Sequence, residues 1–401
     1  MDTSQSRPVT EEAAQNGSQE GRMAAGQYQP LIKVIGVGGG GSNAIDRMIH
    51  VGIPGVQFIA VNTDAQALSL SEAPHKVQLG PQVTGGLGAG GDPAIGAKAA
   101  RESTEVLYEA VNGAEVLFIA LGLGGGTGTG AAPVIAELAR RTGALAIAVA
   151  TLPFGFEGYK RKETAREGLR ALAATADTLV AISNDRLLEF IEEHTSLDIA
   201  FRIADDVLRQ GIQGVAELIT STGVINLNLM HVRKVLQKAG PALMSIGQAR
   251  GENRAIEAAQ LAIASPLTQL SSISGASAIL VNVTGGEDLS LDEVQEAVST
   301  VAGVASPDAE VFFGATVDPN MAQQLQVMLI AVGMNGRASI TVPDTAVSDR
   351  AVRQGPVGSM RAGQAAALDM LESQESMDLY DMDVPTFLRR RKLARIGEET
   401  A

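Results

Sequence analysis

Two glycine-rich segments carry the residues best suited to chemistry in this chain of 401 residues. The segment Gly124–Gly130 reads Gly-Gly-Gly-Thr-Gly-Thr-Gly, and it lies between an apolar run at 116–121 and a helix-like run that ends at Arg141. Glycine lets the backbone approach an anion closely and adopt positive φ. Threonine hydroxyls and the amides at a helix N-terminus supply hydrogen-bond donors. The segment therefore predicts a phosphate-binding loop; a flexible linker, the alternative, does not fit between a buried strand and an amphipathic helix.

The second glycine-rich segment, Gly38–Asn43, follows a strand-like apolar run at 31–37. We expect the next helix to begin near Ala44 with Ser42 or Asn43 as its cap, because a side-chain oxygen there can accept from the first free amides. Two successive strand–loop–helix units predict a parallel α/β sheet with a nucleotide at its carboxyl edge.

The second segment also fits a dinucleotide fingerprint. Gly36, Gly38 and Gly41 match G-x-G-x-x-G, and Asp64 ends the next strand-like run about twenty residues on. An NAD-dependent dehydrogenase is therefore the competing interpretation. The loop Gly124–Gly130 favours a nucleoside triphosphate, because a dinucleotide fold has no general need for it. The ordinary P-loop pattern G-x-x-x-x-G-K-[ST] does not occur in the chain.

Composition argues against several classes of protein and of site. The chain has no cysteine, hence no disulfide or thiolate metal site, and its four histidines lack ligand spacing. No apolar run reaches the ~20 residues of a membrane span, and the polar N-terminus does not resemble a signal peptide. A net charge of −14 and the absence of tryptophan disfavour nucleic acid as a partner. These features predict a cytoplasmic protein.

The chain is long enough for two domains with tails. Residues 1–29 are polar and glycine-rich, which predicts a disordered extension. Residues 30–195 hold alternating elements, 196–222 one long helix with an apolar stripe, and 223–340 a second, smaller α/β domain. In the first domain we expect strands near 31–37, 56–62, 115–121, 144–151 and 177–183, and helices near 43–51, 93–111, 130–142 and 159–175. In the second we expect helices near 251–264 and 290–303, and strands near 277–284, 309–317 and 325–332.

Two glycines lie inside the expected long helix, and Gly223 is positioned to end it. Each of Gly211 and Gly214 costs ~1 kcal/mol relative to alanine in a helix, so we expect close packing against a neighbour to compensate. Residues 341–377 are typical of a flexible linker, and 378–401 of a tail that binds a partner.

These motifs, in order and spacing from about Ile32 to Met334, resemble the FtsZ family, the tubulin-like GTPases of bacterial cell division. Gly124–Gly130 is the tubulin-type signature. The resemblance implies a tubulin/FtsZ-like fold with a parallel-sheet nucleotide-binding domain, a long central helix and a second smaller α/β domain. Further matching segments are 61–68, 86–90, 153–158, 184–185 and 205–208.

The resemblance implies GTP as the ligand, with Mg²⁺ held by phosphate oxygens and water and by no protein side chain. Glu157 would accept from the ribose hydroxyls and Arg161, four residues later, would support it, although this spacing also fits a plain surface ion pair. Asn184 and Asp205 would read guanine, and Phe201 would stack on it. The phosphates would contact Gly39, Gly40, Gly41, Ser42, Asn43, Gly126, Thr127 and Gly128, with 88–90 near the γ-phosphate.

The chain departs from the family in the loop after the long helix, which in the family enters the next subunit's site and supplies two aspartates for hydrolysis. Those positions are Asn228 and His231 here, and residues 222–233 contain no carboxylate. Asparagine can orient a water but cannot take its proton. Histidine, with a pKa of ~6.5, can act as a base near neutral pH. The chain is therefore expected to hydrolyse GTP slowly, or with the help of an intact paralogue in a mixed filament.

The C-terminal tail contains an acidic, apolar and basic island that resembles the FtsZ tail peptide, and a frayed terminus is the alternative. The resemblance implies docking on membrane-tethering and regulatory division proteins, beneath the membrane at mid-cell. The residues expected to bind are Asp383, Val384, Pro385, Phe387, Leu388 and Arg389. The sequence thus predicts a GTP-binding protein that polymerises head-to-tail into the cell-division ring, with a non-hydrolysing structural paralogue as the alternative.

Overall fold

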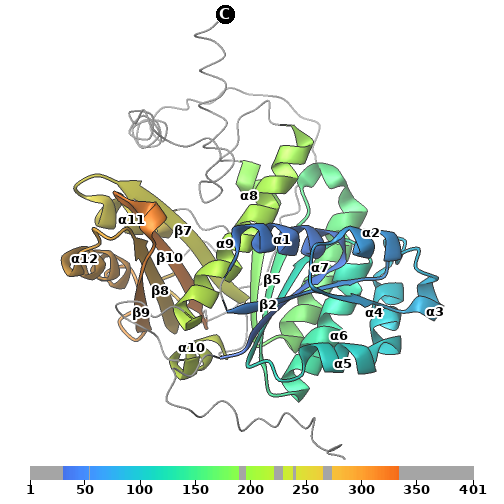
Figure 1. Cartoon of the computed structure of the whole chain (residues 1–401). Helices are drawn as coiled ribbons and strands as arrows, with labels where there is room; N and C mark the ends of the chain where they lie inside the picture. The colour runs from blue at the N-terminus through green and yellow to red at the C-terminus, as the bar shows by residue number, and fades with distance from the viewer. Residues whose placement is uncertain are drawn as a thin grey trace, which may run out of the picture.

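The computed structural model describes residues 30–53, 55–188, 196–220, 229–237, 241–264 and 273–333. A ten-stranded sheet in the order β3-β2-β1-β4-β5-β6-β7-β10-β8-β9 runs through them (Figure 1). Strands β3 to β7 of this order are parallel, whereas β10 is antiparallel to both β7 and β8. β6 and β7 pair through only two residue pairs, Leu179↔Pro241 and Val180↔Ala242. This narrow junction separates a parallel first half from a mixed second half, which confirms the predicted fold class.

The first half is a parallel sheet covered by helices. Four of its central strands are mostly apolar runs buried almost throughout, as a parallel sheet with both faces covered requires. Its strands are β1 (Ile32–Val37), β2 (Val56–Asn62), β3 (His75–Gln78), β4 (Val116–Gly122), β5 (Leu145–Leu152) and β6 (Thr178–Ser183). Its helices are α1 (Gly38–Val51), α2 (Ala65–Leu70), α3 (Pro81–Thr84), α4 (Pro93–Glu102), α5 (Thr104–Val111), α6 (Thr127–Arg141), α7 (Tyr159–Thr175) and α8 (Asn184–Leu187).

Two helix predictions in this half are wrong. α1 begins at Gly38, not near Ala44, and its cap residue Val37 makes no side-chain cap bond, so Ser42 and Asn43 lie inside the helix. The expected helix over 93–111 is two helices that meet at Ser103. The hydroxyl of Ser103 accepts from the amide of Gly80 at 2.9 Å, a tertiary contact that no local pattern encodes.

The long central helix α9 (Leu197–Thr220) links the two halves (Figure 1). A Cβ added at Gly211 would lie 2.7 Å from Met244 Cε, and one at Gly214 would overlap Met328 Sδ. The expected close packing at these two glycines is confirmed. The expected stop at Gly223 lies outside the described residues.

The second half contains two elements that the sequence analysis did not predict, α10 and β7. α10 has only eight residues, and polar Ser245 and Gln248 interrupt the apolar pattern of β7. No helix in the described ranges is both long and apolar enough to span a membrane. The elements are α10 (Leu229–Leu236), β7 (Pro241–Arg250), α11 (Arg254–Ala264), β8 (Ala278–Gly285), α12 (Leu291–Ala302), β9 (Glu310–Val317) and β10 (Gln324–Val332).

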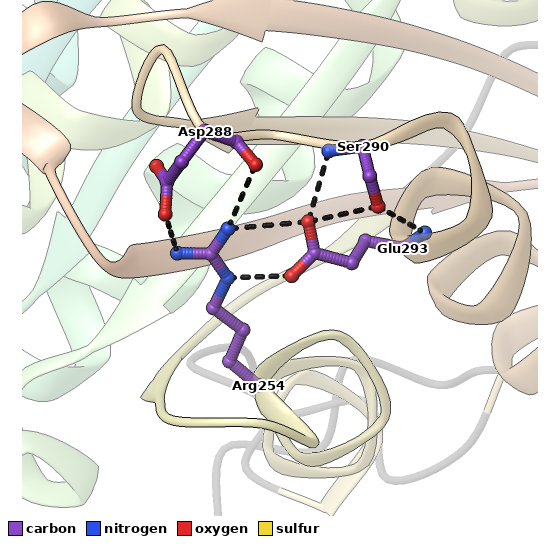
Figure 2. Close-up of polar contacts among 4 residues, drawn as sticks. All are labelled: Arg254, Asp288, Ser290 and Glu293. Atoms are coloured by element: carbon purple, nitrogen blue, oxygen red, sulfur yellow. Dashed lines mark hydrogen bonds and ion pairs between the residues drawn. The ribbon is translucent and has the colours of Figure 1, made fainter.

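A polar cluster fixes the start of α11 to the start of α12, and we call Arg254, Asp288, Ser290 and Glu293 the Arg254 clasp (Figure 2). The Arg254 guanidinium, 6% exposed, pairs with Asp288 Oδ2 at 2.7 Å and with Glu293 Oε1 at 2.6 Å. Glu293 also accepts from the amide of Ser290, closing a capping box at the start of α12. These hydrogen bonds to Arg254 hold the pKa values of both carboxyls below their usual range.

Candidate nucleotide-binding site

The two glycine-rich segments meet at the carboxyl edge of the sheet. β1 and β4 are parallel neighbours in which Val37 pairs with Leu121, so α1 and the loop before α6 leave the sheet side by side. A Cβ added at Gly38 would lie 3.1 Å from the amide nitrogen of Gly128. The helix N-termini of α1 and α6 therefore converge, and both direct free amides and positive dipole ends to one place.

The glycines of these loops form two groups that differ in what surrounds the position of an added Cβ. A Cβ at Gly41 would overlap the Ala120 carbonyl oxygen, and one at Gly130 would overlap that of Pro93. A Cβ at Gly128 would lie 2.8 Å from the Gly122 carbonyl oxygen. Gly39 and Gly125, in contrast, have nothing within 4 Å of such a Cβ. The first group permits backbone packing, and only the second group borders open space that an anion could fill.

The remaining residues expected at the phosphates are brought to the same edge. Gly40 and Asn43 are exposed on α1, whereas Ser42 is 5% exposed and its Oγ has no hydrogen-bond partner within the described part of the chain. The hydroxyls of Thr127 and Thr63 lie 2.6 Å apart, which joins α6 to the end of β2. The Ser42 hydroxyl is thus one of the few buried polar groups in the described part of the chain without a hydrogen-bond partner.

A third loop, residues 86–91, closes this edge. Gly88 donates to the carbonyl of Thr63 at 3.2 Å, and Gly88 and Gly90 both have positive φ. A Cβ at Gly126 would lie 2.9 Å from Ala89 Cβ, so the loop packs directly on the glycine segment before α6. Gly126 thus lies at this edge of the sheet, where it packs against residues 86–91.

Glu157 and Arg161 form the ion pair that their spacing predicted, at 3.2 Å. Glu157 is largely buried, and its other carboxylate oxygen accepts from the amide of Phe154 at 2.7 Å. The Arg161 side chain also lies against the glycine segment, since a Cβ at Gly124 would be 2.8 Å from Arg161 Cγ. The carboxylate therefore organises its own loop, and acceptance from a ribose stays a prediction.

The three residues expected at the base lie on α8 and α9. Asn184 is 4% exposed and its Oδ1 has no partner among the described residues, while Phe201 is 38% exposed on α9. Asp205, one turn after Phe201, is 13% exposed at its side chain. Burial raises the pKa of Asp205 to about 6, and the nearby Arg47 opposes this rise.

Arg47 is a site residue that the sequence analysis missed. Its Nε donates to Asp205 Oδ2 at 3.4 Å, which joins α1, the helix that begins at the glycine segment, to α9. Its position four residues after Asn43, on the same face of α1, is the signal that could have indicated it. The pairing keeps a cation beside a buried carboxylate and so favours its ionised form.

His231 lies far from the candidate nucleotide site of its own chain. It is exposed on α10, where its ring centroid is 5.7 Å from that of Phe312. Phe201 and Thr220 are separated by about 28 Å along α9, and α10 lies beyond the far end of that helix (Figure 1). His231 therefore cannot serve the site on its own chain. Asn228 and the tail residues 383–389 lie outside the described residues.

The described residues of the site offer hydrogen-bond donors to an anion. Within the described ranges, no group of three or more His, Asp or Glu side chains is placed to hold a metal ion. The arrangement suits a cation that arrives bound to phosphate oxygens and keeps its water, as magnesium does.

Both halves of the chain are similar to known proteins. Residues 31–192 match the model of the Tubulin/FtsZ family GTPase domain, and residues 240–335 match that of the FtsZ family C-terminal domain. The structure is similar to an empty FtsZ dimer from M. jannaschii, with 44% identity, a TM-score of 0.74, and coverage of 77% of this chain and 89% of that chain. It is also similar to CetZ2 from Haloferax volcanii, solved as a GTPγS-bound protofilament, with 25% identity, a TM-score of 0.65, and coverage of 77% and 95%.

Proposed function

Because the chain belongs to the tubulin/FtsZ family, whose members are GTPases, we propose that it binds GTP and polymerises head-to-tail into filaments of the cell-division ring. The observation that carries the proposal is the pair of acceptors at the base end of the site: the buried Asp205 carboxylate and the unpartnered Asn184 Oδ1. Two of the similar structures are a dimer and a protofilament, which supports self-assembly.

Guanine selection follows from hydrogen-bond chemistry. Guanine presents a ring N–H and an exocyclic amine on one edge, and the carboxylate of Asp205 can accept from both. Adenine presents a ring acceptor there, so the buried carboxylate would keep only the hydrogen bond from Arg47 and would gain no donor from the base. A site built to accept hydrogen bonds rejects an analogue that lacks the donors, since its buried groups stay unpaired.

Phosphate binding uses the backbone of the three glycine loops. Free amides at the starts of α1 and α6 donate to phosphate oxygens, and the open faces of Gly39 and Gly125 leave room for them. Mg²⁺, when bound with the nucleotide, neutralises charge that develops on the phosphates.

Hydrolysis would take place between subunits, because α9 separates His231 from the site of its own chain. Water attacks the γ-phosphorus, the bond to the β–γ bridging oxygen breaks, and the products are GDP and phosphate. We propose that the neighbouring subunit's loop positions this water, and that hydrolysis is slow because residues 222–233 offer no carboxylate. A mixed filament with an intact paralogue would supply the missing acids.

An FtsZ-like role is favoured over a CetZ-like cytoskeletal role by sequence. Identity is 44% to the FtsZ structure against 25% to CetZ2, and the second half matches the FtsZ C-terminal domain. We propose that residues 378–401 recruit membrane-tethering division proteins to the filament at mid-cell. An NAD-dependent dehydrogenase would need a nicotinamide site, and both domain matches favour the GTPase instead.

The deciding experiment combines binding and turnover on the full chain. We expect GTP to bind at least a hundredfold more tightly than ATP, a difference of roughly 2.7 kcal/mol. Phosphate release is then followed against protein concentration, with pelleting of the same samples. Polymer that forms with GTP and releases little phosphate supports the proposal. Equal affinity for GTP and ATP, or no assembly at any concentration, contradicts it.

A further inference from the structure

Three phenylalanine rings join the loop after β5 to the central helix, and we call Phe154, Phe156 and Phe201 the phenylalanine ladder. Phe154 stacks on Phe156, with centroids 5.0 Å apart and planes at 13°. It also meets Phe201 edge to face, with centroids 5.4 Å apart and planes at 82°. Phe154 is completely buried, whereas Phe156 and Phe201 are 60% and 38% exposed. The ladder therefore consists of a buried middle ring, Phe154, between two partly exposed rings.

The backbone around Phe154 is fixed before any ligand binds. Its amide donates to Glu157 Oε1 at 2.7 Å, and its carbonyl accepts from the amide of Glu157 at 3.1 Å. The next residue, Gly155, donates to Asp185 Oδ1 at 2.6 Å, and Lys162 Nζ lies 3.3 Å from the other oxygen of the same carboxylate. Contacts from Glu157, α7 and α8 thus hold the backbone that carries the middle ring.

Phe201 is 38% exposed, and its buried side meets Phe154 edge to face. Edge-to-face aromatic pairs favour the paired arrangement by roughly 2- to 12-fold in an equilibrium constant. Phe201 precedes Asp205 by one helical turn, which places the ring beside the carboxylate expected to read guanine. An orientation fixed in advance removes an ordering cost when the base stacks.

We propose that Phe154 is a positioning residue for base recognition: it holds Phe201 ready to stack on guanine and links that ring to the Glu157 loop. The inference rests on the proposed function, because Phe201 needs a base on which to stack. Phe154 itself, with no exposed surface, does not touch the ligand. Its effect must therefore pass through Phe201 and leave phosphate binding unchanged.

The test compares GTP with inorganic tripolyphosphate, which has the phosphates and no base. Calorimetry on the full chain should show that Phe154→Leu weakens GTP binding about 2- to 10-fold, while the Kd for tripolyphosphate stays the same. Phe118→Leu, at an equally buried phenylalanine on β4, is the matched control, and it should leave the ratio of the two affinities unchanged. Phe156 is exposed, so Phe156→Leu should not disturb folding. It should change the ratio of GTP affinity to tripolyphosphate affinity in the same direction as Phe154→Leu, by a smaller factor.

A double-mutant cycle separates positioning from general damage. In a Phe201→Leu background, Phe154→Leu should have no further effect on GTP affinity, because the ring it orients is gone. Equal losses for GTP and tripolyphosphate, or an undiminished effect in that background, would overturn the positioning role. A wild-type chain that binds tripolyphosphate as tightly as GTP would instead contradict the proposed base site, so the two failures are distinguishable.

Discussion

Substituting two neighbouring glycines of α1 should separate ligand contact from packing. A methyl group added at Gly39 would have nothing within 4 Å, whereas one added at Gly41 would overlap the Ala120 carbonyl oxygen and lie 2.8 Å from Gly36 C. The side chain added by Gly39→Ala meets only open space, and that space is where we place the phosphates. The side chain added by Gly41→Ala meets backbone of β1 and β4 that cannot move aside freely.

The two substitutions should therefore differ in which property they change, thermal stability or GTP affinity. Gly41→Ala should destabilise the first domain by about 1–3 kcal/mol, the usual cost of overpacking. A loss of that size lowers Tm by roughly 2–4 °C per kcal/mol for a domain of this size. Gly39→Ala should leave Tm unchanged or slightly higher, because alanine lowers the entropy of the unfolded chain. Its GTP affinity should fall at least tenfold, or about 1.4 kcal/mol.

Thermal unfolding without nucleotide and calorimetric titration with GTP measure the two effects on the same samples. Each variant is the control for the other, since both add one methyl group to the same helix. If Gly39→Ala binds GTP normally, the phosphates do not lie against α1 at that position. If Gly41→Ala keeps the wild-type Tm, the assignment of this glycine to packing is wrong.

Three further predictions concern the base site, the second half and the catalytic loop. If the Asp205 carboxylate reads guanine as proposed, GTP affinity should fall as pH drops through about 6, the pKa of this carboxyl. Asp205→Asn should remove this step, and titrations from pH 5 to 8 would reveal it. A pH profile identical in both proteins would refute this role. Arg254→Met should cost about 3 kcal/mol in denaturant unfolding, because it leaves a largely buried carboxylate without its cation. Folding lowers the pKa values of both clasp carboxyls, so the clasp stabilises the fold at pH values above the pKa values of these groups in the unfolded chain. This stabilisation is lost as pH falls through their lower pKa values in the folded protein. A loss of unfolding free energy in Arg254→Met that is the same at pH 7 and pH 3 would contradict this role of the clasp. Asn228→Asp with His231→Asp should raise GTP turnover in the homopolymer, and unchanged turnover with filaments intact would show that the missing acids do not limit the rate.

Much of the fold was predictable because its signals are local. The central parallel strands are mostly apolar runs, and α12 carries its own capping box, so both can be found without tertiary information. β7 was not found, since polar residues interrupt its pattern, and it is a strand because β10 pairs along it. The break between α4 and α5 likewise depends on Ser103 accepting from Gly80, which lies 23 residues earlier.

At the site, the sequence by itself determined which groups are offered: glycine segments after buried strands, and the family-matched Asn184 and Asp205 with Phe201 one turn before Asp205. Only the tertiary structure decided which glycines face open space and which pack on backbone, because both kinds look the same in a sequence. It also brought Arg47 to Asp205 across 158 residues and set the phenylalanine ladder behind the base site. The reason is physical: residue type fixes which hydrogen bonds and contacts a group can make, but burial and partners arise only when distant elements pack together.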